Sequence, residues 1–124
     1  MRRILISDDD LIQLDLRKQL LEIAGYRVDV AFTASQTLLA IQKHCPDLVI
    51  VDLRMPNREG VADPREGLAL IRRIREAGCH TPVLVLSGWP EDIYGHPEEL
   101  MVSRVLLKPV KTRDLIHTIG ELLT

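Results

Sequence analysis

Leu48-Val49-Ile50-Val51-Asp52 is the stretch of this 124-residue chain that decides its fold. Its four aliphatic residues show no polar alternation, which is typical of a strand buried on both faces in a parallel sheet. A carboxylate follows at the point where the apolar run ends. Ligands of open α/β sheets bind beyond the carboxyl ends of the strands, so Asp52 is a candidate functional residue.

Three further apolar runs end in polar residues in the same way. Ile4-Leu5-Ile6 is followed by Ser7-Asp8-Asp9-Asp10, Val83-Leu84-Val85-Leu86 by Ser87, and Val105-Leu106-Leu107 by Lys108-Pro109. Because parallel strands end at one rim of the sheet, we expect these carboxylates, the hydroxyl and the ammonium to meet there. That set of groups suits a divalent cation and a phosphoryl group.

Helical patterns alternate with the strand patterns along the whole chain. The sequence predicts five strands, over residues 3–7, 26–31, 47–52, 81–87 and 104–107. Asp10 and Thr33 are predicted helix caps, and the first helix carries apolar residues at helical spacing, which are Ile12, Leu16, Leu20 and Ile23. Two more helices are expected, one ending at Gly78 and one reaching the C-terminus. Residues 90–101 are expected to be weakly helical at best, because Gly95 and Pro97 interrupt them.

Alternation of this kind predicts an α/β fold of the doubly wound, three-layer type. We expect a five-stranded parallel sheet of order 2-1-3-4-5, the flavodoxin-like arrangement. In that order the first and third strands are neighbours, so that Asp8, Asp9 and Asp52 converge at the switch point.

Composition narrows the class of protein further. The net charge is −2 with both signs interspersed, which gives no basis for nucleic-acid binding. Apolar residues make up 46 % of the chain and aromatic residues only 3 %, so an aliphatic core is expected. The apolar runs are too short to cross a bilayer, and no signal segment follows Met1, so we expect one cytoplasmic domain over residues 1–124. Cys45 and Cys79 match no metal spacing and are expected to be reduced and buried or half-buried.

The acidic residues at the rim predict a magnesium (or manganese) site. Mg²⁺ prefers oxygen ligands and keeps several waters, and the pair Asp8-Asp9 beside Asp52 offers such ligands. Without the metal these carboxylates repel one another, so at least one of them should have a raised pKa. Carboxylates also serve as nucleophiles in phosphoryl transfer.

Each of these residues also has an ordinary structural explanation when it is taken alone. For Asp10 the better explanation is a helix cap, whereas for Asp8 and Asp9 a capping role, with charges that favour the helix N-terminus, and a functional role both stay open. Asp52 and Ser87 fit turn positions, and Lys108-Pro109 fits the start of a loop. The ordinary explanations do not account for polar groups at the ends of four neighbouring strands of the expected sheet.

Taken together, these motifs resemble the response-regulator receiver domain of two-component signalling, of the CheY-like superfamily, over nearly the full length of the chain. The stretches that carry the resemblance are residues 4–10, 47–56, 84–88 and 107–109. The resemblance implies that Asp52 is the phosphoacceptor. It also implies that Asp9 binds the metal directly, that Asp8 acts mainly through water, and that Arg54 gives a backbone carbonyl.

The same resemblance assigns the switch hydroxyl to Ser87 and the phosphate-binding lysine to Lys108. It implies a histidine kinase or phosphotransfer protein as the donor, and a domain that catalyses only its own phosphorylation and dephosphorylation. Phosphorylation would switch the surface from the fourth strand to the final helix, in a monomer or weak dimer. The downstream target is not specified.

Three departures from the family pattern stand out. Val105 occupies the position where many receivers carry an aromatic switch residue. Residues 57–65 form a partial insertion, which is either a tolerated surface loop or a gating or contact element. The fourth helix of the family, between the last two strands, is expected to be short or distorted here, over residues 90–101. Apart from these departures, Trp89 lies two residues after Ser87 and either covers the site or packs in an ordinary way.

Two rival functions are considered beside the phosphoacceptor. A phosphatase of the haloacid dehalogenase type needs a second Asp two residues after the nucleophile, where this chain has Arg54, and it also needs a cap domain. A receiver-like interaction module with altered or lost phosphorylation-dependent switching agrees with Val105 and with the distorted fourth helix. The acidic set and Lys108 argue against that module.

Overall fold

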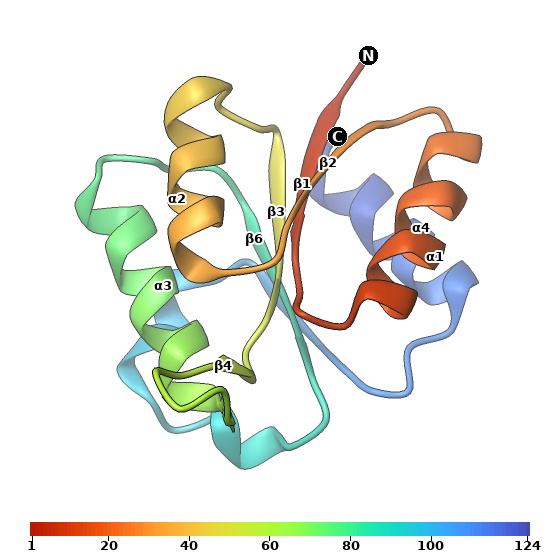
Figure 1. Ribbon diagram of the computed structural model, residues 1–124. Coiled ribbons are helices and arrows are strands. Elements are labelled where there is room, and N and C mark those ends of the chain that lie inside the picture. The colour runs from red at the N-terminus through yellow and green to blue at the C-terminus, as the bar shows by residue number, and fades with distance from the viewer.

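The computed structural model describes all 124 residues of the chain (Figure 1). The strands are β1 (Arg3–Ser7), β2 (Arg27–Ala31), β3 (Leu48–Asp52), β4 (Met55–Pro56), β5 (Ala62–Asp63), β6 (Val83–Ser87) and β7 (Arg104–Leu107). The α-helices are α1 (Leu11–Ile23), α2 (Ala34–Lys43), α3 (Pro64–Glu76) and α4 (Thr112–Leu122). Two short 3₁₀ helices, η1 (Pro90–Asp92) and η2 (Pro97–Met101), lie between β6 and β7.

The main sheet has five parallel strands in the order β2-β1-β3-β6-β7. This confirms the predicted flavodoxin-like order, in which the first and third strands are neighbours. Ser7 is in register with Val51, and Asp52 with Leu86, so the polar residues that end β1, β3 and β6 share one rim.

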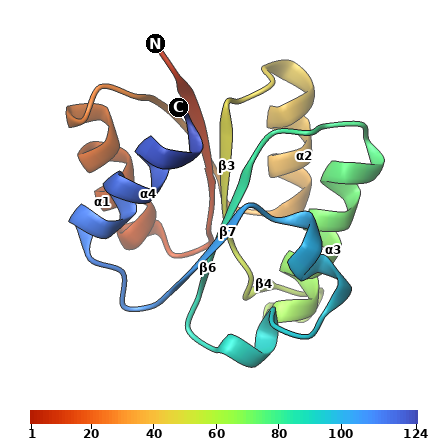
Figure 2. The ribbon, with the colours of Figure 1, turned by 180° about the vertical axis from the view of Figure 1, so that it is seen from behind.

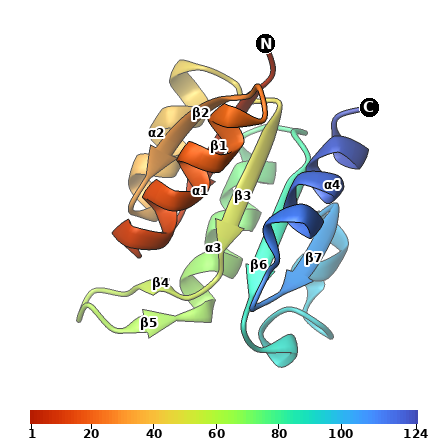
Figure 3. The same cartoon turned by 90° about the vertical axis from the view of Figure 1, so that its right-hand side faces the viewer.

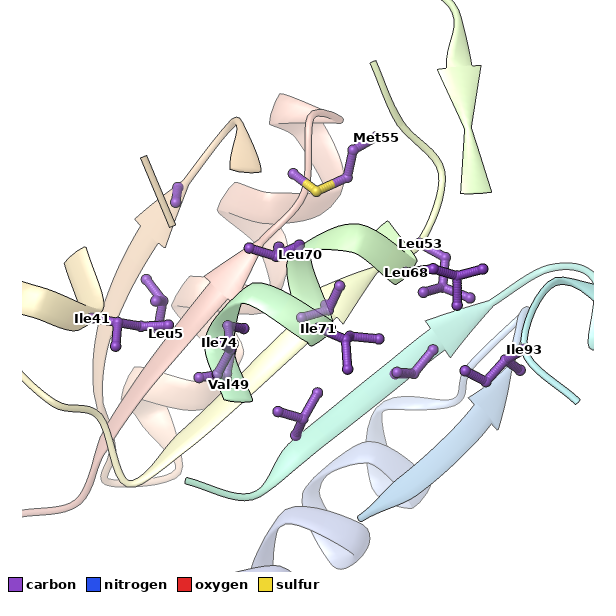
Figure 4. Packing of buried hydrophobic residues seen from close by; sticks show 14 residues of the cluster. Leu5, Ile41, Val49, Leu53, Met55, Leu68, Leu70, Ile71, Ile74 and Ile93 are labelled. Carbon is purple, nitrogen blue, oxygen red and sulfur yellow. The ribbon is translucent and has the colours of Figure 1, made fainter. Parts of the chain in front are cut away.

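Helices cover both faces of the sheet. Helices α1 and α4 lie on one face and α2 and α3 on the other (Figures 1 and 2). Each face has its own apolar cluster, and residues of β3 and β6 alternate between the two clusters. Figure 4 shows the cluster between α3 and the sheet, which includes Leu70, Ile71 and Ile74 of α3 and Val49 of β3. The core is aliphatic, as the composition predicted.

The predicted helix caps are confirmed. The Asp10 carboxylate accepts hydrogen bonds from the backbone N–H groups of Ile12 and Gln13, and Thr33 Oγ1 accepts one from Gln36. Such caps satisfy N–H groups that have no partner inside the helix.

The predicted first helix is confirmed, but the apolar residues that indicated it are not the ones that it buries. Ile12, Leu16 and Ile23 are exposed, at 79, 49 and 84 %, and the helix buries Leu14 and Leu21 instead. Both sets of residues have helical spacing, so periodicity could not decide which face meets the sheet. The buried face also carries Arg17, three residues after Leu14, and this arginine is directed at the rim.

Two irregular segments lie at the rim. Residues 57–65, expected to be a loop, include the turn and second strand of a hairpin: β4 and β5 pair antiparallel, and the hairpin projects from the body in Figure 3. Residues 90–101 contain no α-helix, as predicted.

At the opposite end of the sheet, Cys79 is half-buried as expected. Cys45 is exposed, which corrects its expected burial, because it lies in the loop that precedes Pro46 and β3. No helix of the chain has both the length and the apolar character that a membrane span requires.

Candidate functional site

Asp52 and Lys108 form an ion pair at the centre of the rim. Lys108 Nζ donates to Asp52 Oδ2, although the two residues are 56 positions apart in the sequence. The N–H of Arg54 donates to Asp52 Oδ1 at 3.3 Å. The Lys108 backbone N–H donates to the Ser87 carbonyl at 2.7 Å, which fixes the start of the lysine loop beside the end of β6. The sheet order therefore brings together a carboxylate and an ammonium, as the sequence predicted.

Asp8 is the most buried acidic side chain of the site, with 1 % exposure. Its carboxylate accepts from the Asp10 N–H at 3.0 Å and from Arg17 Nη1 at 3.0 Å. Burial raises the pKa of Asp8 above its usual range, and the negative charge of Asp52 acts in the same direction. The expected raised pKa in the acidic cluster is confirmed, with burial as a larger cause than repulsion.

Asp9 follows Asp8 and is exposed to solvent. No three Asp, Glu, His or Cys side chains are arranged closely enough to hold a metal ion by themselves. A cation here would therefore need backbone oxygen and water in addition to the carboxylates, a mixture that Mg²⁺ accepts. One observation fits such an ion: the side-chain oxygens of Asp8, Asp9 and Asp52 are hard ligand atoms.

Ser87 is buried, with 2 % exposure, and its hydroxyl is engaged locally. Ser87 Oγ donates to the Trp89 carbonyl at 2.8 Å and accepts from the Trp89 N–H at 3.2 Å. The residue thus lies at the rim as predicted, but its proton points to the backbone of the next loop rather than to Asp52. Next to it, Gly88 has no atom within 4 Å of the position that a Cβ would take.

Sequence reasoning missed the side chains that surround this core. Arg17 pairs with Asp8, and the Arg54 side chain pairs with Asp92 and stacks on Trp89. Arg17 lies between Leu14 and Leu21 on one helical face, but Lys18 lies there too, so the sequence alone does not single out the arginine. Asp92 lies in an irregular segment, where no periodicity predicts the direction of a side chain.

The family follows from a match along almost the whole chain. Residues 4–120 match the family model described as the response regulator receiver domain. The chain belongs to the response regulator receiver family. It is therefore a receiver domain of the two-component type, and this confirms the resemblance seen in the sequence motifs.

Curated relatives of this receiver are transcriptional regulators. It is 35 % identical over 96 residues to the virulence transcriptional regulatory protein PhoP of Salmonella typhimurium. It is 34 % identical over 86 residues to the transcriptional regulatory protein DltR of Streptococcus agalactiae. The matches cover 75 and 69 % of this chain but only 39 and 35 % of those proteins, so the chain spans well under half the length of these relatives.

Solved structures share the fold of this receiver. A response regulator receiver domain protein from Clostridium thermocellum superposes with a TM-score of 0.85 at 28 % identity, covering 99 % of this chain and 94 % of that one. The response regulator TrrA of Thermotoga maritima, solved in complex with Mg²⁺ and BeF, gives a TM-score of 0.84 at 25 % identity and covers 99 and 100 %.

Val105, which replaces the aromatic residue of many receivers, contributes to the apolar core in this structure. Val105 of β7 is half-buried and lies against the apolar cluster of the α3 face. An aliphatic side chain in that place contributes to the core and offers no ring that could turn.

Proposed function

We propose that this receiver accepts a phosphoryl group on Asp52 from the phosphohistidine of a sensor kinase or phosphotransfer protein, with Mg²⁺ as cofactor. The observation that carries the proposal is the Lys108–Asp52 ion pair beside buried Asp8, because three distant strands deliver these groups to one point. In this proposal residues 1–124 act as one receiver unit, whatever further domains its full protein contains.

Four residues would hold the cation: Asp8, Asp9 and Asp52 through carboxylates, and Arg54 through its backbone carbonyl. Mn²⁺, which also suits carboxylate and carbonyl oxygens, would serve in place of Mg²⁺. When bound, the ion supplies positive charge that offsets the charge on the phosphoryl oxygens. The raised pKa of Asp8 supports this assignment, since added positive charge would relieve the cost of a buried carboxylate.

The chemical step follows from the groups at the rim. A carboxylate oxygen of Asp52 attacks phosphorus, the P–N bond of the donor breaks, and the released imidazole takes up a proton. Lys108 then moves its three N–H donors from the carboxylate to the phosphoryl oxygens. The Ser87 hydroxyl turns from the Trp89 carbonyl to another of those oxygens. Catalysis of this type rests on positioning and charge stabilisation.

Phosphorylation of the isolated chain tests the proposal. Incubation with acetyl phosphate and Mg²⁺ should add the mass of one phosphoryl group to the wild type, and a metal chelator should prevent the addition. Asp52→Asn should gain nothing, whereas Asp63→Asn, which alters an aspartate of the hairpin outside the site, should be phosphorylated like the wild type. An unmodified wild type, or a phosphorylated Asp52→Asn variant, would refute the assignment.

The second candidate is a receiver-like interaction module without a phosphorylation-dependent switch. Packed Val105 and the engaged Ser87 hydroxyl favour it, since neither is arranged as the usual switch requires. The Lys108–Asp52 pair favours the phosphoacceptor instead. The dehalogenase-type phosphatase is disfavoured by the family match and by Arg54 at the position of its acid/base aspartate.

A further inference from the structure

The Arg54 side chain links the phosphoacceptor strand to the segment that follows Ser87. Its guanidinium carbon lies 3.4 Å from the centroid of the Trp89 ring. Its Nε donates to Asp92 Oδ2 at 2.8 Å, and its Nη2 donates to Asp92 Oδ1 at 3.3 Å. A planar guanidinium is suited to both contacts at once, because it forks onto a carboxylate and stacks on an aromatic face.

Asp92 depends on this arginine. The aspartate is 7 % exposed, and no other side chain donates to its carboxylate. A buried carboxylate that loses its only partner is strongly destabilised, so η1 keeps its present place only while Arg54 stays. The hydrogen bond to Asp92 also raises the pKa of Arg54, which is charged at every accessible pH.

Trp89 joins the same linkage to the switch hydroxyl. Its carbonyl accepts the Ser87 proton and its N–H donates back to Ser87 Oγ. If Ser87 turns to a phosphoryl oxygen, the Trp89 carbonyl loses its hydrogen bond at the same moment. Phosphorylation of Asp52 would therefore affect both the Ser87–Trp89 hydrogen bonds and the Arg54–Asp92 ion pair.

We propose that Arg54, Trp89 and Asp92 form the conformational switch of this receiver, in place of an aromatic residue at position 105. This inference rests on the proposed function. A phosphoryl group on Asp52 adds charge and three acceptor oxygens next to Arg54, and guanidinium groups bind phosphate in the forked geometry that they offer to carboxylate. Arg54 moves from Asp92 to the phosphoryl group, and Asp92 is released to solvent.

The change is confined to the first part of the loop. Glu98 of η2 is tied to Arg72 of α3 at 2.5 Å, and the Met101 carbonyl accepts two hydrogen bonds from Arg75. Gly95, with φ of 87°, separates these anchored residues from η1. Residues 89–95 have no such tie to α3, and all of them except Asp92 and Ile93 are exposed, so this is the part that can rearrange around the buried Ile93 side chain. They lie at the same end of the molecule as the β4–β5 hairpin (Figure 3).

The single tryptophan provides the readout. Beryllofluoride with Mg²⁺, a stable mimic of the phosphoryl group, should change Trp89 fluorescence in the wild type. It should also speed amide exchange in residues 89–95 by about tenfold, while residues 97–101 change little. Asp92→Asn should already show the altered fluorescence and exchange without beryllofluoride, and the mimic should add little further change. Asp63→Asn, which alters another ion-paired aspartate, should behave as the wild type.

The outcomes separate the two proposals. If the wild type gains no phosphoryl mass from acetyl phosphate, the proposed function fails and this inference fails with it. If the mass appears while Trp89 and residues 89–95 stay unchanged, or if Asp92→Asn responds as fully as the wild type, the switch alone is refuted. Should Asp92→Asn fold poorly, Arg54→Lys tests the same point, because lysine keeps the charge and the backbone carbonyl but lacks the fork.

A different observation concerns the opposite end of the sheet. The thiols of Cys45 and Cys79, 34 positions apart in sequence, both lie against one oxygen, Thr81 Oγ1, at 3.6 and 3.2 Å. Thr81 gives its only proton to the Pro46 carbonyl at 3.0 Å, so its oxygen accepts from the Cys79 thiol. The Cys45 thiol lies within reach of both this oxygen and the Pro46 carbonyl, which is 3.8 Å from its sulfur. Cys45 is exposed and Cys79 half-buried, which lets a small oxidant reach the pair.

We infer that Cys45 and Cys79 are a modification site that closes to an intramolecular disulfide in the presence of a disulfide oxidant such as oxidised glutathione. The Cys45 thiolate attacks the oxidant's S–S bond and releases one glutathione thiol, leaving a mixed disulfide. The Cys79 thiolate then attacks the Cys45 sulfur and releases the second glutathione. Two protein thiols are oxidised and one glutathione disulfide is reduced.

Intact mass under denaturing conditions tests the pair. The wild type treated with oxidised glutathione should lose two thiol hydrogens and carry no adduct, and peptide mapping should join the Cys45 and Cys79 peptides. Cys79→Ser should instead keep one glutathione on Cys45, because nothing displaces it. Persistent adducts on the wild type, or a linkage found only between molecules in a mixed isotope-labelled sample, would overturn the inference.

Discussion

The buried surroundings of Asp8 disfavour the charged form of its carboxylate. The carboxylate is almost fully buried, and its pKa is raised above 3.8, first by burial and then by the neighbouring Asp52 charge. Asp8 therefore binds its proton more tightly in the folded chain than in the unfolded one. In the pH window from 3.8 up to the folded-state pKa, the folded state holds more protons, so the free energy of unfolding falls as the pH rises.

Asp8→Asn should make the metal-free protein more stable near neutral pH, by about 0.5–2 kcal/mol. Asparagine can still accept a hydrogen bond from Arg17 but carries no charge, so the decline of stability with rising pH should flatten. Urea unfolding in the presence of a chelator, followed at several pH values, measures both effects. Asp9→Asn, at an exposed position, is the matched control and should change stability less. A less stable Asp8→Asn variant at every pH would contradict the argument.

Gly67 shows how closely α3 approaches the end of β3. A Cβ at this position would lie 2.4 Å from Leu53 Cα and 2.5 Å from the Leu53 oxygen, and these backbone atoms cannot yield without moving β3's end. Gly67→Ala should therefore cost about 1–3 kcal/mol in the free energy of unfolding. Gly120→Ala in α4, where a Cβ would meet nothing within 4 Å, should instead be neutral or gain up to about 1 kcal/mol. Urea midpoints of the two variants compare these cases, and equal midpoints would refute the close approach.

The β4–β5 hairpin turns the predicted loop of residues 57–65 into an ordered element that leads into α3. Asn57 Oδ1 accepts from two N–H groups of the turn, and Asp63 caps α3 through the Arg65 N–H. The sequence shows that Asn57 suits a turn and Asp63 a helix cap. It does not show that the two-residue strands β4 and β5 pair with each other.

The pH response of this hairpin is set by Asp63. Hydrogen bonds from Arg65 lower the pKa of Asp63 from 3.8 to about 2. The depressed pKa means that the contribution of Asp63 to stability is present above 3.8 and is lost as the pH falls through about 2. Arg65→Gln should raise the pKa of Asp63 toward 3.8, because the charged partner is gone. A carboxyl titration by NMR measures the shift, and an unchanged pKa in the variant would show that the Arg65 side chain is not its cause.

Irregular segments mark the limit of prediction from sequence within the site. Asp52 and Lys108 were predictable, because each ends a strand whose apolar run fixes its place in a parallel sheet. The partners of Arg54 and Arg72 were not, because Asp92 and Glu98 lie on 3₁₀ turns and are 38 and 26 residues away from these arginines in the sequence. Pattern reasoning predicts regular elements and their ends, and it does not predict which charged side chains meet across a loop.

At the scale of the whole molecule, the predicted meeting of the site residues follows mainly from the order of the strands in the sheet. Once β1 and β3 are neighbours, Asp8 and Asp52 must share a rim, and no detailed side-chain knowledge is needed. The orientation of α1 was harder, because the exposed Ile12 and the buried Leu14 are both consistent with an amphipathic helix. The choice between them follows from Arg17, which must face the buried Asp8 carboxylate.

Folding and cation binding should therefore be linked across the entire domain. Mg²⁺ that binds the folded rim but not the unfolded chain should raise the free energy of unfolding, by about 2.7 kcal/mol at a concentration a hundredfold above its Kd. Asp52→Asn should lose most of this gain, since it removes a charged ligand, whereas Asp63→Asn should keep it. Urea unfolding over a series of Mg²⁺ concentrations at constant ionic strength measures the linkage. The same gain in Asp52→Asn as in the wild type would place the cation elsewhere on the molecule and remove the basis for a metal-assisted phosphoacceptor.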